Sequence, residues 1–506
     1  MTRIRSALKS GPILNLVAGY FCFASTAAYG FASLPVAVHF LDKPQIGLWN
    51  LISQVVAYLI FLEMGVGAAV GRVLAEPIAS RIQSGIDRAW STILAILAIQ
   101  SLLIGLIGWI LSPWVLGYFK IPGNLAAEAG FLWLGMTLLH ATAFPMRAYT
   151  GVLLCQERYH WSLIVSGFTP WIQLAAFAVL LTWGAGLRSY VFATLFVNLC
   201  QLFWLRNLVR RGPHELHFHF KSVTWQSAKP ILGYSFSMVL WSLAPVIVSS
   251  IPAMVLSRSL GLEQVTLYVV SSRVPLMVAM LALRGFHAFY PKIQNLFVTD
   301  QRERFVQVYR LATSLSLLMT GAGLALAMIA NRHVVGFLAR SDFYAGDTVT
   351  LWFALGFIIL AVSEHLGCLF IIAGQGKLVS VALAVEILVT LAAASLLCPH
   401  FGMAGVAAAL ALAPLLVRIP YYLICGPRTC SCAIMDLYGN ASLGVAAAVL
   451  AVIITYLFLR VHENSFMSLV AASLILPALA LGITCCRRLW HDIQASNDTP
   501  AESINS

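Results

Sequence analysis

Three arginines stand inside long apolar segments of the sequence. Arg273 lies near the middle of one segment, whereas Arg147 and Arg418 lie nearer the ends of two others. A charge at the centre of an apolar membrane helix costs about 2.5–3.5 kcal/mol on insertion scales, so each arginine needs a function or a partner. A guanidinium offers paired N–H donors that fit a diphosphate. We therefore interpret all three arginines as candidate substrate-binding residues. The alternative for Arg273 is an internal ion pair. The alternative for Arg147 and Arg418 is that their side chains extend to the membrane interface.

Acidic and imidazole side chains also occur in the apolar segments. Glu364 and His365 are adjacent in one segment, and Glu386 lies in the next. Such groups can take up a proton or a sodium ion inside a membrane and couple it to a conformational change. The carboxylates could equally be the counter-charges of the arginines, and the sequence leaves both interpretations open.

Two further polar patterns are interpreted as structural. Glu63 and Arg72 stand at the end of an apolar segment, which suggests a gating or structural pair rather than a ligand site. The polar stretch after the sixth apolar segment contains three closely spaced histidines, His214, His217 and His219. Their spacing resembles that of metal-binding histidines, but we interpret the stretch as a solvated linker. We predict no metal site and no resident cofactor, with proton or sodium coupling left open.

The composition excludes a soluble protein. Of the 506 residues, 60% are hydrophobic and only 10% are charged, against about 45–50% and about 25% in soluble domains. The net charge of +12 would suggest nucleic acid in a soluble protein, but no basic run exceeds the pair Arg210-Arg211. The rule that cytoplasmic loops of membrane proteins are rich in Lys and Arg explains the charge better. We expect a multi-pass protein of the bacterial inner membrane with both termini in the cytoplasm.

The apolar segments predict an all-α fold, because open sheet edges cannot face lipid. A span needs about 20 mostly apolar residues, and about fourteen segments qualify. They are 12–40, 46–71, 89–112, 127–153, 161–183, 187–206, 230–256, 264–289, 306–330, 346–374, 378–398, 402–425, 440–460 and 466–486.

Matches between the two halves recur at a spacing of 219 residues. Trp133 corresponds to Trp352, and Gln156 corresponds to Gln375. Six spans are an even number, so two such halves would have the same orientation, as in transporters with parallel repeats. At this spacing Gln54 is the equivalent of Arg273, which makes it a further candidate cavity residue. The predicted domains are 1–207 (six-helix bundle), 208–229 (cytoplasmic linker), 230–426 (second six-helix bundle), 427–486 (two extra helices) and 487–506 (cytoplasmic tail).

Residues 46–76, IGLWNLISQVVAYLIFLEMGVGAAVGRVLAE, carry a family-like motif. A Gly-Leu-Trp at Gly47–Trp49 precedes the span, Glu63 precedes Gly65-Val-Gly67 at its end, and Arg72 precedes Ala75-Glu76. This pattern resembles the opening signature of the bacterial polysaccharide (O-antigen-type) flippases, in which the acidic residue is usually Asp. A second stretch of the sequence is similar to the matching part of that family: Leu260-Gly261, Tyr268, Arg273 and Tyr290-Pro291.

The resemblance implies the multidrug/oligosaccharidyl-lipid/polysaccharide exporter superfamily. It implies a flippase that moves an undecaprenyl-diphosphate-linked glycan to the outer leaflet by alternating access, with membrane lipid and other polysaccharide-assembly proteins as partners. A cation-coupled multidrug antiporter and a lipid II flippase are the alternatives. Fourteen spans fit the lipid flippases better than the drug exporters, which usually have twelve. A lipid II flippase is expected to carry arginines in its first span, but no charged residue lies between Lys9 and Asp42.

An enzyme and an ATP-driven pump are disfavoured by the sequence. A glycan polymerase or ligase would need catalytic side chains on a substantial outer loop, and the outward loops are short. The nucleotide-binding pattern of a Gly-rich loop followed by Lys and Ser or Thr does not occur. We therefore predict a transporter that is not an enzyme and does not bind nucleic acid.

Overall fold

The computed structural model describes residues 11–59, 82–119, 121–212, 216–430 and 449–457, with isolated positions 70, 73, 74, 76–78 and 80. Within these ranges the chain is helical and forms no β-strand. The contacts divide it into two compact units, Met1–Thr266 and Leu267–Ser506, called here the first unit and the second unit. Each is described by itself.

Long apolar helices dominate both units, as expected for a chain whose backbone groups must be satisfied inside lipid. Nine helices of the described part are long and apolar enough to cross a membrane. Their ranges are Val17–Phe40, Gln83–Tyr118, Gly123–Cys155, Tyr159–Thr182, Arg188–Arg210, Leu262–Val298, Arg302–Ala339, Asp347–Ile372 and Gly376–Gly426. The chain is thus a multi-pass membrane protein built from helices.

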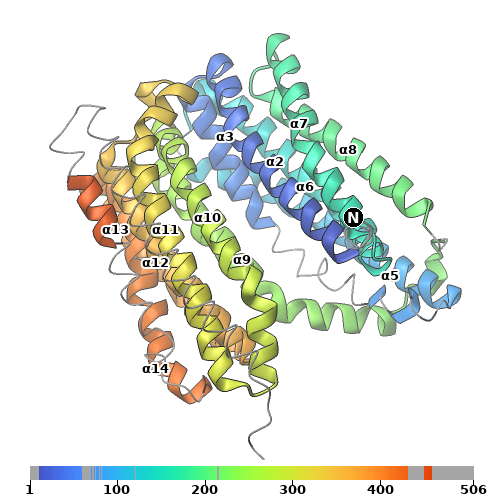
Figure 1. Cartoon of the computed structure of the whole chain (residues 1–506). Coiled ribbons are helices and arrows are strands. Elements are labelled where there is room, and N and C mark those ends of the chain that lie inside the picture. The colour runs from blue at the N-terminus through green and yellow to red at the C-terminus, as the bar shows by residue number, and fades with distance from the viewer. Residues whose placement is uncertain are drawn as a thin grey trace, which may run out of the picture. The chain divides into compact units, whose positions relative to one another are not determined.

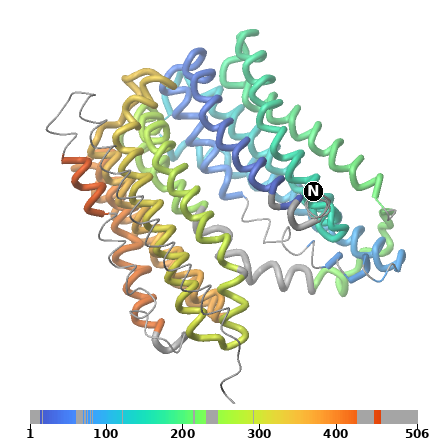
Figure 2. Tube along the Cα trace, in the orientation of Figure 1, coloured from blue at the N-terminus to red at the C-terminus, as the bar shows by residue number. Residues whose placement is uncertain are grey.

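The first unit is a helical bundle. Its helices are α2 (Gly11–Phe40), α3 (Lys43–Val56), α5 (Gln83–Tyr118), α6 (Ala126–Cys155), α7 (Tyr159–Thr182), α8 (Arg188–Arg210) and α9 (Trp225–Ser259). Helix α2 packs along α7, α5 packs along α6, and α8 contacts both α6 and α7 (Figures 1 and 2). Helix α3 contacts α6 and α9. The short helices η2 (Gly123–Leu125) and η3 (Phe220–Ser222) lie in connections.

Gly47, in the family-like motif, lies at a close helix contact of the first unit. A Cβ atom at this position would stand 2.0 Å from the backbone carbonyl oxygen of Leu262. Close by, the Thr266 hydroxyl donates a hydrogen bond to the backbone carbonyl of Lys43 at 2.6 Å. Only glycine lets the two backbones approach this closely, so this part of the motif has a packing role.

The second unit continues α10 (Leu262–Val298) and contains α11 (Arg302–Ala339), η4 (Ser341–Phe343), α12 (Asp347–Ile372), α13 (Gly376–Leu416) and α14 (Arg418–Cys430). Helix α12 packs on α11, α13 and α14. Inside α13, Gly402 has φ 58° and ψ −138°, a conformation that suits glycine and breaks the helix direction. The predicted spans 378–398 and 402–425 therefore meet at a kink, and the second of them is broken again between Leu416 and Arg418.

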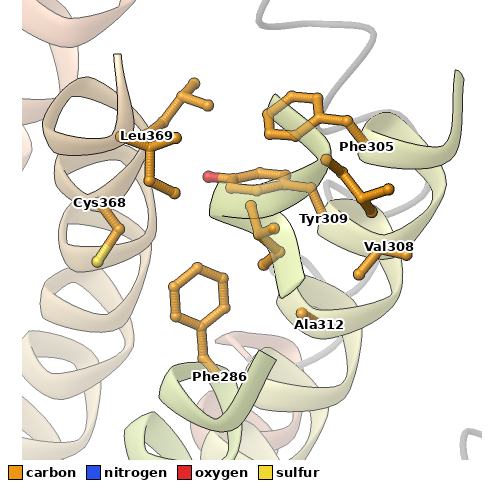
Figure 3. Close-up of a cluster of buried hydrophobic side chains, with 10 residues drawn as sticks. Phe286, Phe305, Val308, Tyr309, Ala312, Cys368 and Leu369 are labelled. Atoms are coloured by element: carbon orange, nitrogen blue, oxygen red, sulfur yellow. The ribbon is translucent and has the colours of Figure 1, made fainter. Parts of the chain in front are cut away.

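A hydrophobic cluster joins three helices of the second unit. Figure 3 shows Phe286 of α10, Tyr309 of α11 and Leu369 of α12 turned toward one another. The buried members of the cluster are Phe286, Ile293, Leu296, Phe305, Val308, Tyr309, Ala312, Cys368, Leu369 and Ile372. The cluster fixes α12, which carries two of the predicted coupling residues.

Every predicted span up to residue 425 contains a described helix. The thirteenth is described only at 449–457, where it is helical, and the fourteenth lies outside the described residues. The helix starts at Gln83 and Arg302 are 219 residues apart, whereas those at Ala126 and Asp347 are 221 apart and those at Tyr159 and Gly376 are 217 apart. The repeat itself stays a prediction.

The division by contacts falls after Thr266, later than the predicted linker 208–229, because α9 packs on α3 and α5.

Candidate functional site

Three of the predicted charged residues meet in the second unit as one ion cluster. Arg418, the first residue of α14, donates from Nη1 to Glu364 Oε1 of α12 at 2.8 Å. Its Nη2 donates to Glu386 Oε1 of α13 at 3.1 Å, and its Nε donates to Glu386 Oε2. The guanidinium thus holds one carboxylate with two parallel hydrogen bonds and a second with one. This is the geometry in which arginine binds carboxylates most strongly.

The ion cluster is largely hidden from solvent. The side chains of Arg418, Glu386 and Glu364 are 6%, 1% and 28% exposed. Removing an ion from water costs several kcal/mol, and pairing offsets this only when the geometry is good. Two carboxylates and one guanidinium leave a formal charge of −1, unless one carboxylate carries a proton. The ion cluster can therefore accept one more cation or one proton without acquiring a net positive charge.

His365 follows Glu364 in sequence but lies in a different environment. Its Nε2 is 3.1 Å from the Ser316 hydroxyl, and its ring lies 4.2 Å from the ring centre of Phe286. Tyr309 donates a hydrogen bond to the His365 backbone carbonyl at 2.9 Å. Consecutive residues of a helix point about 100° apart, so His365 contacts Phe286 of the hydrophobic cluster whereas Glu364 pairs with Arg418.

A tyrosine that the sequence analysis did not single out lies beside the ion cluster. Tyr422 stands four residues after Arg418 on α14, and its ring stacks on Phe370 at 4.9 Å. Its hydroxyl is buried and has no hydrogen-bond partner among the residues that the structure describes. A Cβ atom at Gly367 would lie 3.4 Å from that hydroxyl, so the hydroxyl lies against α12 at this glycine. The spacing of Arg418 and Tyr422, which places both on one helix face, was the signal available in the sequence.

The ion cluster has no charged equivalent in the first half of the sequence. The residues found 219 positions earlier are Pro145, Gly167 and Leu199. The Gly167 carbonyl accepts a hydrogen bond from the Ser25 hydroxyl, and the Phe21 ring lies against the glycine. If the halves are duplicated, they differ at these three positions.

The other predicted binding residues are half-buried and lie in different units. Arg273 is on α10 in the second unit. Arg147 is on α6 in the first unit, with its guanidinium 5.2 Å from the ring centre of Phe144, a cation–π distance. Gln54 is on α3 in the first unit, and its side-chain oxygen is buried with no hydrogen-bond partner in the described part of the chain. That Arg273, Arg147 and Gln54 line one cavity stays a prediction.

The remaining predicted residues are only partly described. Glu63, Arg72 and His214 lie outside the described residues. His217 and His219 lie in the segment after α8 and are exposed. Within the described ranges no group of His, Cys, Asp or Glu side chains is arranged to hold a metal ion.

The fold is similar to those of known transporters. An inward-closed structure of the lipid II flippase MurJ matches with a TM-score of 0.71 and 14% identity, covering 94% of this chain and 99% of that one. An inward-facing MATE multidrug transporter of the MOP superfamily matches with a TM-score of 0.67 and 15% identity, covering 80% of this chain and 95% of that one. A MATE transporter of Vibrio cholerae matches with a TM-score of 0.58 and 14% identity, covering 92% of this chain and 100% of that one.

No family model and no curated protein matches the sequence. At 14–15% identity the structural likeness establishes the fold and nothing finer. The chain has the helical fold found in MOP-superfamily transporters, which agrees with the superfamily that the motif at 46–76 suggests.

Proposed function

We propose that the protein is a flippase for a lipid-linked oligosaccharide, moving an undecaprenyl-diphosphate glycan from the cytoplasmic to the outer leaflet of the bacterial inner membrane. The observation that carries the proposal is the fold: a lipid flippase matches over 94% of this chain and 99% of its own. The motif at Gly47–Glu76, which resembles the polysaccharide flippases, supports a glycan carrier rather than lipid II. Partners in polysaccharide assembly belong to the same proposal.

Arg273 is the residue we propose to hold the diphosphate. A half-buried guanidinium inside a membrane-spanning helix can donate two N–H groups to a phosphate. Arg147 and Gln54 are proposed to contact the headgroup from the first unit in the course of alternating access. Moving an anionic headgroup outward is favoured by the inside-negative potential, by about 2.3 kcal/mol per charge per 100 mV.

Arg418 has a different role in this proposal. Its guanidinium already binds two carboxylates, so it has few donors left for a substrate. We assign it, with Glu364 and Glu386, to ion coupling: uptake of a proton or a sodium ion would compete with Arg418 for a carboxylate. Because Arg418 begins α14, a change in this pairing would act on the position of that helix.

Depletion of the protein in its host, followed by mass spectrometry of the lipid extract, tests the proposed substrate. We expect a polyprenyl-diphosphate oligosaccharide to accumulate, because the carrier is still loaded in the cytoplasmic leaflet but no longer crosses. Accumulation of lipid II instead would assign the protein to peptidoglycan synthesis. If no lipid intermediate accumulates in a host that makes both, the lipid-flippase proposal is wrong and a soluble substrate of an antiporter becomes the better hypothesis.

A further inference from the structure

The first unit contains a cavity that none of the predicted transport residues lines. Its volume is about 540 Å³, within the range of about 300–1,000 Å³ typical of small-molecule sites. It lies where the ends of α6 and α8 meet the beginning of α5. The lining residues are Trp90, Leu94, Tyr149, Arg206, Val209, Arg210, Leu216, His217 and Phe218.

One wall of this cavity is the segment Leu216–Phe218, which is hydrogen-bonded to α5. After α8 the chain turns toward the first residues of α5 (Figure 1). The backbone N–H of His217 donates to Asp87 Oδ1 at 3.1 Å, and the backbone N–H of His219 donates to the Ser91 hydroxyl at 2.9 Å. Asp87 also accepts a hydrogen bond from Gln83 at 2.9 Å. The carboxylate therefore serves to hold the wall and is not among the residues that line the cavity.

The cavity combines positive charge with aromatic surface. Arg206 and Arg210 are four residues apart on α8, so both side chains project from one face of the helix. Both are exposed, and neither makes an ion pair or hydrogen bond with the part of the chain that the structure describes. Trp90 and Tyr149 meet edge to face with their ring centres 5.2 Å apart. The carbonyl end of α8 contributes only about half a negative charge, less than the two arginines supply.

We propose that this cavity binds a phosphate ester, with Arg206 and Arg210 on the phosphoryl oxygens and the rings of Trp90 and Tyr149 against the remainder of the ligand. Arginine is suited to this task because its fork of N–H donors matches phosphate geometry. Two sources offer this chemistry: the headgroup of an anionic phospholipid, since the cavity lies at an end of the helix bundle, and a soluble nucleotide. The site does not depend on the proposed transport, because none of the predicted transport residues lines it.

Binding to the purified full-length protein in a neutral detergent tests this site. The probes are ADP, measured by equilibrium dialysis, and phosphatidylglycerol, counted by native mass spectrometry against phosphatidylcholine. The variants are R206A, R210A and the double variant. The matched control is R211A, which removes the same charge from the adjacent exposed position that does not line the cavity. Gel filtration establishes that each variant is folded and monodisperse.

We expect R206A and R210A each to weaken binding of one probe about tenfold, which corresponds to about 1.4 kcal/mol, and R211A to leave it unchanged. Loss of ADP binding in this pattern identifies a nucleotide site. Loss of phosphatidylglycerol binding in this pattern identifies a lipid-headgroup site. If neither probe binds the wild type, or if R211A weakens binding as much as the two lining variants do, the proposed site is wrong. Because the readout is binding, failure of the flippase proposal would leave this result unaffected.

Discussion

Removal of Arg418 should destabilise the protein strongly, because it would leave two carboxylates together with no cation. Glu386 is 1% exposed and Glu364 is 28% exposed, so water can solvate neither fully. Deleting one partner of a buried ion pair typically costs about 3–5 kcal/mol. We expect Arg418→Met, which keeps much of the side-chain volume, to lower the free energy of unfolding by about that amount.

The measurement is the free energy of unfolding in mixed micelles, titrated with sodium dodecyl sulfate. Glu386→Gln in the Arg418→Met background should recover about 2–3 kcal/mol, because the most deeply buried charge is then gone. The matched control is Arg340→Met. Arg340 pairs with Asp342 at 3.1 Å in the same unit, but both side chains are exposed, so its loss should change stability little. The reasoning is refuted if Arg418→Met and Arg340→Met are equally mild, or if Glu386→Gln recovers nothing.

Three further outcomes are expected. Arg273→Ala should abolish transport in proteoliposomes while the protein is still inserted. Arg273→Lys should keep part of the transport activity if a positive charge is enough, and should lose it if the paired N–H donors of arginine are needed. Full activity of Arg273→Ala would remove this residue from the substrate site. Tyr309→Phe should cost about 1 kcal/mol in the same detergent titration, the worth of one hydrogen bond; no loss would show that the bond contributes nothing. Gly47→Ala should cost about 1–3 kcal/mol, because its Cβ would overlap the Leu262 carbonyl. Gly105→Ala, where a Cβ meets nothing within 4 Å, is the control that should not destabilise.

The helical fold could be predicted from the sequence because length and apolar composition leave a membrane protein few options. A span must be about 20 apolar residues long and must satisfy its own backbone. Each predicted segment up to residue 425 accordingly contains a helix. The break at Gly402 falls where the predicted span 378–398 gives way to the span 402–425, but the second break, between Leu416 and Arg418, was not predicted. Helix α9 packs in the first unit through contacts with α3 and α5, which are far from it in sequence. The 219-residue spacing does not reveal which helices make such contacts.

The residues of the ion cluster could be singled out from the sequence, but which of them pair with one another could not. Buried charges are conspicuous in apolar segments, so Glu364, Glu386 and Arg418 were all identified from the sequence. Arg418 was interpreted as a candidate substrate ligand, and the two carboxylates were left open as coupling residues or as counter-charges of the arginines, without a specific pairing. The structure pairs Arg418 with residues 54 and 32 positions away. Which helices bring charges together is a property of tertiary packing, and the helix period alone does not reveal it.

Transport by the purified protein tests the central claim most directly. The protein is reconstituted into vesicles whose inner and outer leaflets contain a radiolabelled undecaprenyl-diphosphate oligosaccharide, and a sugar-modifying enzyme is added outside. We predict that the labelled glycan of the inner leaflet becomes accessible when the wild type is present, and that Arg273→Ala vesicles match protein-free vesicles. Access to lipid II but not to the oligosaccharide, or access to neither, would contradict the proposed function.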